Sequence, residues 1–395
     1  MTGYPLVAST WDQAEIAAMQ AVIASGEYTM GERVQAFEEQ FARFVGSRYC
    51  VMVNSGSSAN LLAVAALFHR SERPLRRGDE AIVPAVSWST SYFPLHQYGL
   101  RLKFVDIDER TLNYDLGALG SALSDRTRLV LAVNLLGNPN DFLALEAMLR
   151  GRDIVVLEDA CESLGARLDA RQAGTFGALG TYSAFYSHHI STMEGGMVVT
   201  ADEELYHLLL SLRAHGWTRN LPKRNRVCAD KSDDPFEESF RFVLPGYNLR
   251  PLELCGAIGL EQLRKLPGFL RVRRDNALKF AELVRRYDGL RMQQEIGESS
   301  WFGFSLVLEE RAAVSRPALL ARLAQAGIET RPIVSGNFAG QEVVRRWLDY
   351  SIHGTLRHAE HLSRAGFFVG NHPHPLDREL DLLRDALDRA FARAP

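Results

Sequence analysis

The chain has 395 residues, enough for one large domain and a second, smaller one. Its 46% hydrophobic and 24% charged residues are ordinary for a globular protein, and a formal net charge of −3 excludes a basic field for nucleic acid or a polybasic membrane anchor. No signal-peptide pattern or membrane-spanning run is visible, and the scattered cysteines predict no disulfide framework, so we expect a reducing cytoplasm. These cysteines are Cys50, Cys161, Cys228 and Cys255.

Two helices are expected at the start of the chain, over residues 11–25 and 31–45. The second has apolar side chains at three- and four-residue steps, as an amphipathic helix does. Between them Tyr28, Thr29 and Met30 form a turn. Taken alone, this turn is a connector between two helices.

Strand-like and helix-like stretches alternate from residue 49 to residue 215. Apolar strands are expected near residues 50–54, 80–84, 102–106, 128–134, 153–158 and 181–186. Such alternation is typical of βα units. It predicts a doubly wound, mainly parallel sheet with helices on both faces.

The stretch from Ser55 to Asn60 follows the first of these strands and begins a helix rich in Ala and Leu. A strand, a turn of small residues and a helix start bring backbone N–H groups and a positive dipole end to one spot, which suits a phosphate. The motif is not a Walker loop, because no lysine follows Gly56. Taken alone, the motif allows a phosphate cradle but does not establish one.

Trp88 and Asp159 also follow predicted strands. An acid at the carboxyl end of a parallel strand lies where open α/β sheets bind ligands, although an Asp there is more commonly a helix N-cap. A buried core residue is the ordinary explanation of Trp88. Both positions therefore allow a structural and a functional interpretation.

The stretch from Ser183 to Thr200 carries His188 and His189, followed by Glu194-Gly195-Gly196. Its plain interpretation is a β-hairpin with two surface histidines. A zinc site is less favoured, because adjacent residues of an extended chain point to opposite faces and no other ligand stands at suitable spacing.

The rest of the chain gives weaker signals. A charged tract at 221–240 is either a solvated loop or part of a binding pocket. Arg331 is either a surface charge or a residue that binds a carboxylate or phosphate. Helices are expected at 203–215, 251–265, 272–287, 315–327 and 377–393, with a half-buried strand within 300–308.

The stretch around His188 resembles the signature of the DegT/StrS-like sugar aminotransferases, in which a Schiff-base lysine follows Ser-Phe and precedes Gly-Glu-Gly-Gly. Counting back six residues from Glu194 puts the lysine position on His188. That departure resembles a small branch of the family, the sugar 3-dehydratases. The resemblance implies an aspartate-aminotransferase-like fold (fold type I), with a large domain at 1–250 and a smaller α+β domain at 251–395.

The resemblance also implies a cofactor, pyridoxal 5′-phosphate or pyridoxamine 5′-phosphate, bound non-covalently because imidazole forms no stable imine. His188 is then the general base, a role that its ordinary pKa of about 6.5 suits. Most relatives have Gln where this chain has Glu162, whose role stays open. The implied cofactor contacts are Gly56, Ser57, Trp88, Asp159, Glu162, Ser183 and Asn248. The implied substrate contacts are Thr29, Met30, Ser187, His215, Arg219, Arg250, Glu329 and Arg331.

The implied reaction removes the C3 hydroxyl of GDP-4-keto-6-deoxymannose, with L-glutamate restoring the amine form of the cofactor, on the way to a dideoxysugar such as colitose. Asn248 in relatives reaches across a homodimer, so shared active sites are expected. No metal is expected, and no iron–sulfur cluster or ferredoxin-type reductase, because no four thiolates lie close together in the sequence. Three alternatives remain: an ordinary sugar aminotransferase, a dehydratase for a CDP-linked sugar, and a pyridoxal-binding scaffold without catalytic activity.

Overall fold

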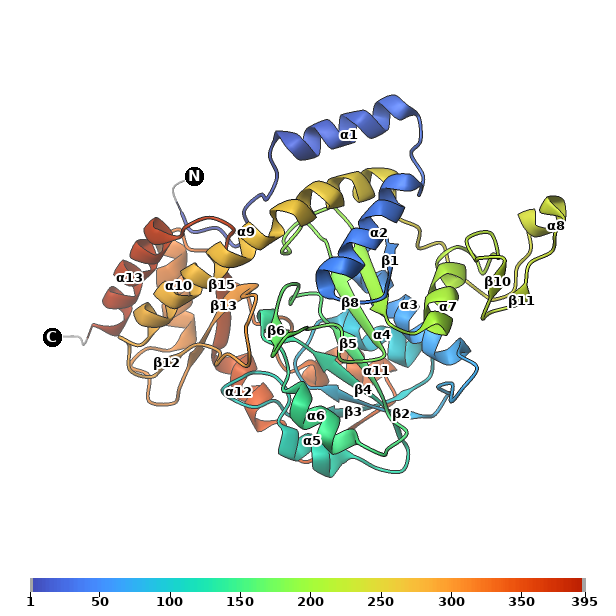
Figure 1. Ribbon diagram of the computed structural model, residues 1–395. Helices are drawn as coiled ribbons and strands as arrows, with labels where there is room; N and C mark the ends of the chain where they lie inside the picture. Colours follow the sequence, from blue (N-terminus) through green and yellow to red (C-terminus); the bar gives the residue numbers. More distant parts are fainter. Residues whose placement is uncertain (1–2, 393–395) are drawn as a thin grey trace.

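The computed structural model describes residues 3–392 and places a sheet of eight strands between layers of helices (Figure 1). β9 runs antiparallel to both of its neighbours, and every other pairing in this sheet is parallel. The predicted doubly wound, mainly parallel sheet is confirmed. In spatial order the strands are β1 (Tyr49–Val53), β9 (Gly196–Thr200), β8 (Leu179–Ser183), β5 (Val155–Asp159), β4 (Thr127–Val133), β2 (Glu80–Pro84), β3 (Arg101–Val105) and β14 (Tyr350–Ile352).

The strands are apolar on both faces because helices cover both. Within β2, Ala81 and Val83 belong to one hydrophobic cluster and Ile82 to another, as the two-residue repeat of a strand requires. One face is covered by α3 (Gly56–His69), α4 (Ser89–Gln97) and α7 (Glu203–Arg213). The other is covered by α2 (Glu32–Val45), α5 (Leu116–Ala122), α6 (Phe142–Leu149) and part of α9 (Glu253–Val284).

α9 corrects a prediction, because one helix spans the two that were expected at 251–265 and 272–287 (Figure 1). Pro267 lies inside it and lacks the N–H of an interior helix residue. The helix continues because Pro267 and Gly268 lie on the exposed side, where a freed carbonyl can bond to water, while the buried stripe runs on unbroken from Leu263 to Leu270. α1 (Gln13–Ser25) and α2 both pack on α9.

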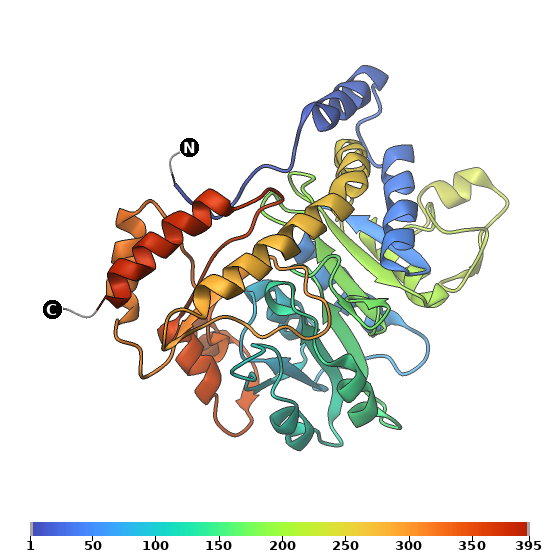
Figure 2. The same cartoon turned by 60° about the vertical axis from the view of Figure 1, so that its left-hand side comes forward.

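A smaller α+β unit follows, and Figure 2 shows α9 leading into it. Its antiparallel sheet has the order β12 (Leu290–Arg291), β13 (Gly303–Leu308) and β15 (Gly366–Gly370). Its helices are α10 (Arg316–Gln325), α12 (Arg357–Ala365) and α13 (Asp377–Phe391), with α11 (Glu342–Trp347) nearby in the chain. The boundary expected at residue 250 stays a prediction. Two segments cross it, since β14 joins the large sheet and Tyr4 pairs with Ile328.

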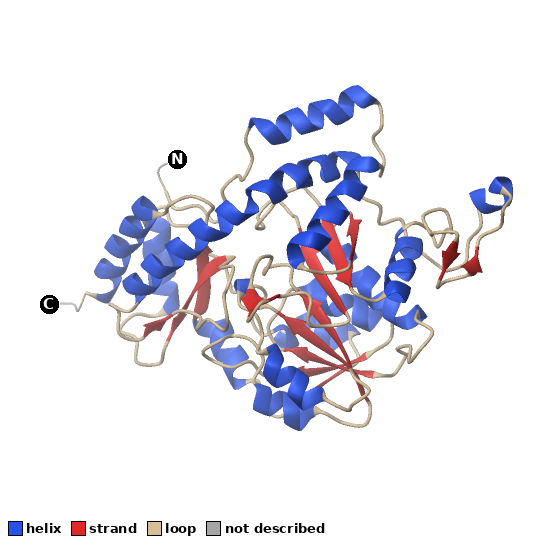
Figure 3. Ribbon diagram, in the orientation of Figure 1, coloured by secondary structure: helices blue, strands red, loops and turns tan. Residues whose placement is uncertain are grey.

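The charged tract expected at 221–240 is not a plain loop. It contains a hairpin of β10 (Arg224–Asn225) and β11 (Ala229–Asp230) and a short helix, α8 (Pro235–Ser239), and it extends away from the body (Figures 1 and 3). Phe236 on it is 87% exposed. Within residues 3–392, no helix has both the length and the apolar character needed to cross a membrane.

Candidate active site

A pocket of about 630 Å³ opens where β5 and β8 end and where α3 and α4 begin. Open α/β sheets bind ligands at this edge, and the volume is in the usual range for a small-molecule site. The pocket is lined by nine of the residues predicted from the sequence. They are Gly56, Ser57, Trp88, Asp159, Glu162, Ser183, Ser187, His188 and Arg331.

The start of α3 forms one end of the pocket. Ser55 caps this helix, and its Oγ accepts a hydrogen bond from the Ser58 N–H at 3.1 Å. A Cβ on Gly56 would lie 2.7 Å from the Cβ of Ser183, so glycine allows the helix start to approach β8 closely. The Ser57 hydroxyl donates to Thr90 Oγ1 at 3.1 Å at the pocket wall. The first N–H groups of a helix have no intrahelical partner, so this end of the pocket suits a phosphate.

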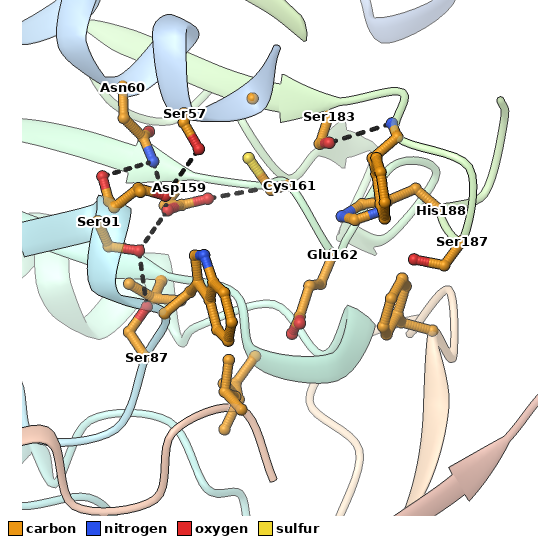
Figure 4. Close-up of a pocket in the computed structure, with 18 of the residues that line it drawn as sticks. Ser57, Asn60, Ser87, Ser91, Asp159, Cys161, Glu162, Ser183, Ser187 and His188 are labelled. Carbon is orange, nitrogen blue, oxygen red and sulfur yellow. Dashed lines mark hydrogen bonds between the residues drawn. The ribbon is translucent and has the colours of Figure 1, made fainter. Parts of the chain in front are cut away.

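Asp159 lies at the end of β5 and is 6% exposed (Figure 4). Its Oδ2 accepts hydrogen bonds from Asn60 Nδ2 at 2.9 Å and Ser91 Oγ at 2.7 Å, and its Oδ1 accepts one from the Cys161 N–H at 3.1 Å. These three donors come from different elements and fix the carboxylate within the pocket. Sequence reasoning missed the roles of Asn60 and Ser91, although Asn60 is a polar residue within an apolar helix.

Glu162 is a second acid in the same pocket (Figure 4). Burial raises its pKa to about 7, the hydrogen bond from the Leu136 N–H opposes that rise, and the nearby Asp159 adds to it. The Leu136 N–H donates to Glu162 Oε2 at 2.9 Å. Near neutral pH this side chain therefore exchanges between a carboxylic acid and a carboxylate.

Trp88 is not a core residue. It is 57% exposed, stands just before α4 and lines the pocket with its indole ring. A large exposed aromatic face at a pocket wall is suited to stacking on a flat heteroaromatic ring. The ordinary explanation from the sequence, a buried tryptophan, is wrong.

His188 lies in the loop 184–195 between β8 and β9, which pair antiparallel, so the expected β-hairpin is confirmed. The expectation that both histidines lie on the surface is wrong. His188 is partly buried at the pocket wall, and His189 is buried behind it. Burial and the positive charge of Arg273 lower the pKa of His188 to about 4, well below the value expected from the sequence. Its Nδ1 is buried without a hydrogen-bond partner among the described residues, which leaves Nε2 as the nitrogen open to a substrate.

The other predicted contacts do not line this pocket within one chain. Thr29 pairs with Leu252, Met30 lies at a separate polar hollow, and Glu329 accepts a hydrogen bond from the Leu6 N–H at 2.9 Å. Their assignment to the substrate stays a prediction.

Four of the remaining predicted residues gather around Trp217, where the chain leaves α7. The Arg219 and Arg250 guanidinium carbons lie 4.9 Å and 5.8 Å from the centre of the Trp217 ring, and the His215 ring lies 4.8 Å from it. Arg250 Nε donates to Asn248 Oδ1 at 3.0 Å. These residues do not line the pocket of their own chain. They form one cationic and aromatic cluster, which we call the Trp217 cluster.

The pocket matches the donor set that pyridoxal phosphate requires. It offers a helix start for the phosphate, the fixed carboxylate of Asp159 for the pyridine nitrogen and the face of Trp88 for the ring. No lysine is among the described residues that line it, and His188 stands at its wall. Fold and site together define a pyridoxal-phosphate enzyme of fold type I that binds its cofactor non-covalently.

Comparison with known proteins narrows this class. The family model described as the DegT/DnrJ/EryC1/StrS aminotransferase family matches residues 9–387, and the chain belongs to that family. It is 56% identical to the GDP-4-keto-6-deoxy-D-mannose 3-dehydratase of Yersinia pseudotuberculosis over 389 residues, which is 98% of this chain and 99% of the relative.

Two solved structures resemble this chain to the same degree in sequence and in fold. One is a GDP-4-keto-6-deoxymannose-3-dehydratase with a trapped PLP-glutamate geminal diamine, and the other is an H188N mutant of such an enzyme with bound GDP-perosamine. Each is 57% identical to this chain, with a TM-score of 0.96, and the match covers 98% of this chain and 100% of the other.

Proposed function

We propose that this chain is a pyridoxamine-phosphate-dependent sugar 3-dehydratase that removes the C3 hydroxyl of GDP-4-keto-6-deoxy-D-mannose and uses L-glutamate to restore its cofactor. The observation that carries the proposal is a histidine at the wall of a pyridoxal-phosphate pocket that is lined by no lysine of residues 3–392. The 56% identity to a 3-dehydratase over nearly the whole chain supports the same substrate.

Each pocket residue has a defined task in this reaction. The start of α3 binds the phosphate, Trp88 covers one face of the ring, and Asp159 holds a proton on the pyridine nitrogen. When bound, the cofactor supplies an amino group for the C4 ketone of the sugar and a ring that withdraws electrons. Arg331 lines the same pocket and is placed to bind the carboxylate of glutamate or the sugar nucleotide.

His188 moves the proton. Because its pKa is lowered to about 4, its imidazole is neutral at pH 7 and is in the form that accepts a proton. Nε2 would take a proton from C4′ of the bound cofactor. Loss of that proton allows the C3 hydroxyl of the sugar to leave. Histidine forms no covalent link to the cofactor, so the enamine product is released, and its hydrolysis gives ammonia and the 3,6-dideoxy-4-keto sugar.

The proposal includes a homodimer with shared active sites. Asn248 and the Trp217 cluster lie outside the pocket of their own chain, on a side of the molecule that also exposes Phe240 and Phe242. An exposed group of aromatic and cationic side chains is typical of an interface. A second copy would place Asn248 at the phosphate of its partner's cofactor.

Shared sites can be tested by co-expressing two inactive variants, H188N and N248A. If each site uses His188 from one chain and Asn248 from the other, random pairing gives one intact site in half of the dimers and restores about a quarter of the wild-type activity. No recovery would show that both residues serve the same chain. The cytoplasm stays the proposed compartment, since the four cysteines are free thiols, as in a reducing environment.

The reaction is tested with purified protein, L-glutamate and GDP-4-keto-6-deoxymannose. The proposal predicts equal amounts of 2-oxoglutarate, ammonia and a sugar that is lighter by its C3 oxygen. Recovery of a 4-amino sugar without ammonia would show an aminotransferase instead. His374, which is exposed and does not line the pocket, provides a matched control, because H374N should keep the activity that H188N loses.

A further inference from the structure

A bent backbone segment, residues 299–302, lies behind the loop that carries the catalytic histidine. The ring of Phe302 lies 5.1 Å from that of His188 and 5.8 Å from that of His189. His189 Nε2 donates to the carbonyl oxygen of Ser300 at 3.1 Å. The two histidines therefore rest on a segment more than a hundred residues further along the chain.

This segment is held in a conformation that its sequence does not favour. Trp301 has a φ of 48°, in the left-handed region that a bulky side chain rarely adopts. From one side, the Ser300 N–H donates to the Gly137 carbonyl at 2.9 Å and the Phe302 N–H to the Leu136 carbonyl at 3.0 Å. A strained backbone persists only where its surroundings fix it on every side.

Arg273 of α9 holds the segment from the other side. Its Nη1 donates to the carbonyl oxygens of Asn371 at 2.6 Å, Phe302 at 3.3 Å and Trp301 at 3.4 Å. The residue is 3% exposed, and no ion pair joins it to a carboxylate within residues 3–392. A buried cation without a counter-ion is costly, and an apolar residue could fill the same stripe of α9. Its charge therefore calls for a functional explanation.

Resting on the proposed function, we propose that Arg273 is a positioning residue for the catalytic base. It fixes the Trp301 and Phe302 carbonyls, so that Phe302 and the Ser300 carbonyl hold the two histidines at the pocket wall with a positive charge behind them.

The charge has a direct consequence for His188. Burial is the larger cause of its lowered pKa, and the charge of Arg273 is the second. A neighbouring positive charge disfavours the imidazolium form of His188. Removing the charge of Arg273 therefore raises the pKa of His188, and His188 becomes protonated, and unable to act as a base, at a higher pH. The other ionisable groups of the same loop and of the pocket wall are His189, Asp159, Cys161, Glu162, Glu194 and Arg331.

Two variants separate charge from geometry. R273K keeps the positive charge but loses the planar guanidinium group. R273Q keeps a neutral N–H donor but loses the charge. We expect both to lower kcat by about 10- to 100-fold with little change in KM, since a small displacement of a base is enough for such a loss. Only R273Q should move the acid limb of the kcat profile to higher pH.

The decisive readout is the imidazole resonance of His188 in cofactor-free protein, titrated by NMR and assigned through its absence in H188N. R273Q should raise the midpoint and R273K should leave it at the wild-type value. The control R264Q removes an exposed cation of α9 that pairs with Glu261 and should change neither the titration nor kcat.

Two results would overturn the proposal: an R273Q midpoint equal to that of the wild type, or a wild-type kcat in R273K. If R273Q does not fold, the titration and kcat of R273K still decide the geometric part. The titration needs neither substrate nor cofactor. A failure of the positioning role is thus distinguishable from a failure of the proposed reaction.

Discussion

Glu162 gives the protein a pH dependence of stability that one substitution isolates. Its pKa is raised from an ordinary 4.5 to about 7, chiefly by burial. Between these two values the unfolded carboxyl is ionised while the folded one still holds its proton, so stability falls as pH rises through this window, and the loss is complete above pH 7. At about 1.4 kcal/mol per unit of pKa, the full loss is about 3 kcal/mol.

E162Q removes the ionisation and keeps an oxygen that can accept from the Leu136 N–H. We therefore expect its free energy of unfolding to exceed that of the wild type by up to about 3 kcal/mol above pH 7, with the excess shrinking toward pH 4.5. Urea denaturation of cofactor-free protein, at one protein concentration and from about pH 5 to about pH 8, measures this difference.

A matched control is E146Q, which replaces a half-exposed acid paired with Arg171. Its difference from the wild type should be small and constant over the same window, as is usual for a surface ion pair. If the difference between E162Q and the wild type were also constant with pH, the raised pKa of Glu162 and the explanation by burial would both be wrong.

Three further variants test how the pocket holds the cofactor, each by absorbance titration with pyridoxal phosphate. S91A removes a donor to the Asp159 carboxylate that is worth about 1.5–3 kcal/mol, so Kd should rise about tenfold or more, and an unchanged Kd would contradict this role. G56A places a methyl group 2.7 Å from a neighbouring serine side chain and should weaken binding, whereas G268A, where a Cβ meets nothing within 4 Å, should not. W88A should lose about 1 kcal/mol of stacking, roughly fivefold in Kd, and W88F should recover most of it.

The sheet was predictable because strand and helix periodicity are local and because helices on both faces make each strand uniformly apolar. Two features of the fold were not. α9 replaces the two helices that the sequence predicts. It contains Pro267, a residue that normally ends a helix, yet its buried stripe continues from Leu263 to Leu270. β14 is three residues long and joins the sheet only through a distant partner, β3, so its own sequence carries little signal.

Within the pocket, too, some residues carry a local sequence signal and others depend on contacts between distant parts of the chain. Gly56, Asp159 and His188 stand at strand ends or within a family motif, so their positions along the chain indicate them. Ser91 and Asn60 act through side chains that meet Asp159 across 68 and 99 residues, which no local pattern reports. The burial of His188 and His189 likewise depends on residues 299–302, which the loop meets only in the folded chain.

The central claim is that an imidazole, and not a tethered lysine, carries out the proton transfer. A single turnover tests it most directly: protein loaded with pyridoxamine phosphate is mixed with GDP-4-keto-6-deoxymannose without glutamate, and the sugar is analysed by mass spectrometry. The wild type should deoxygenate about one sugar per site, while H188N binds the sugar and leaves it unchanged. A deoxygenated sugar formed by H188N at the wild-type rate would contradict the account.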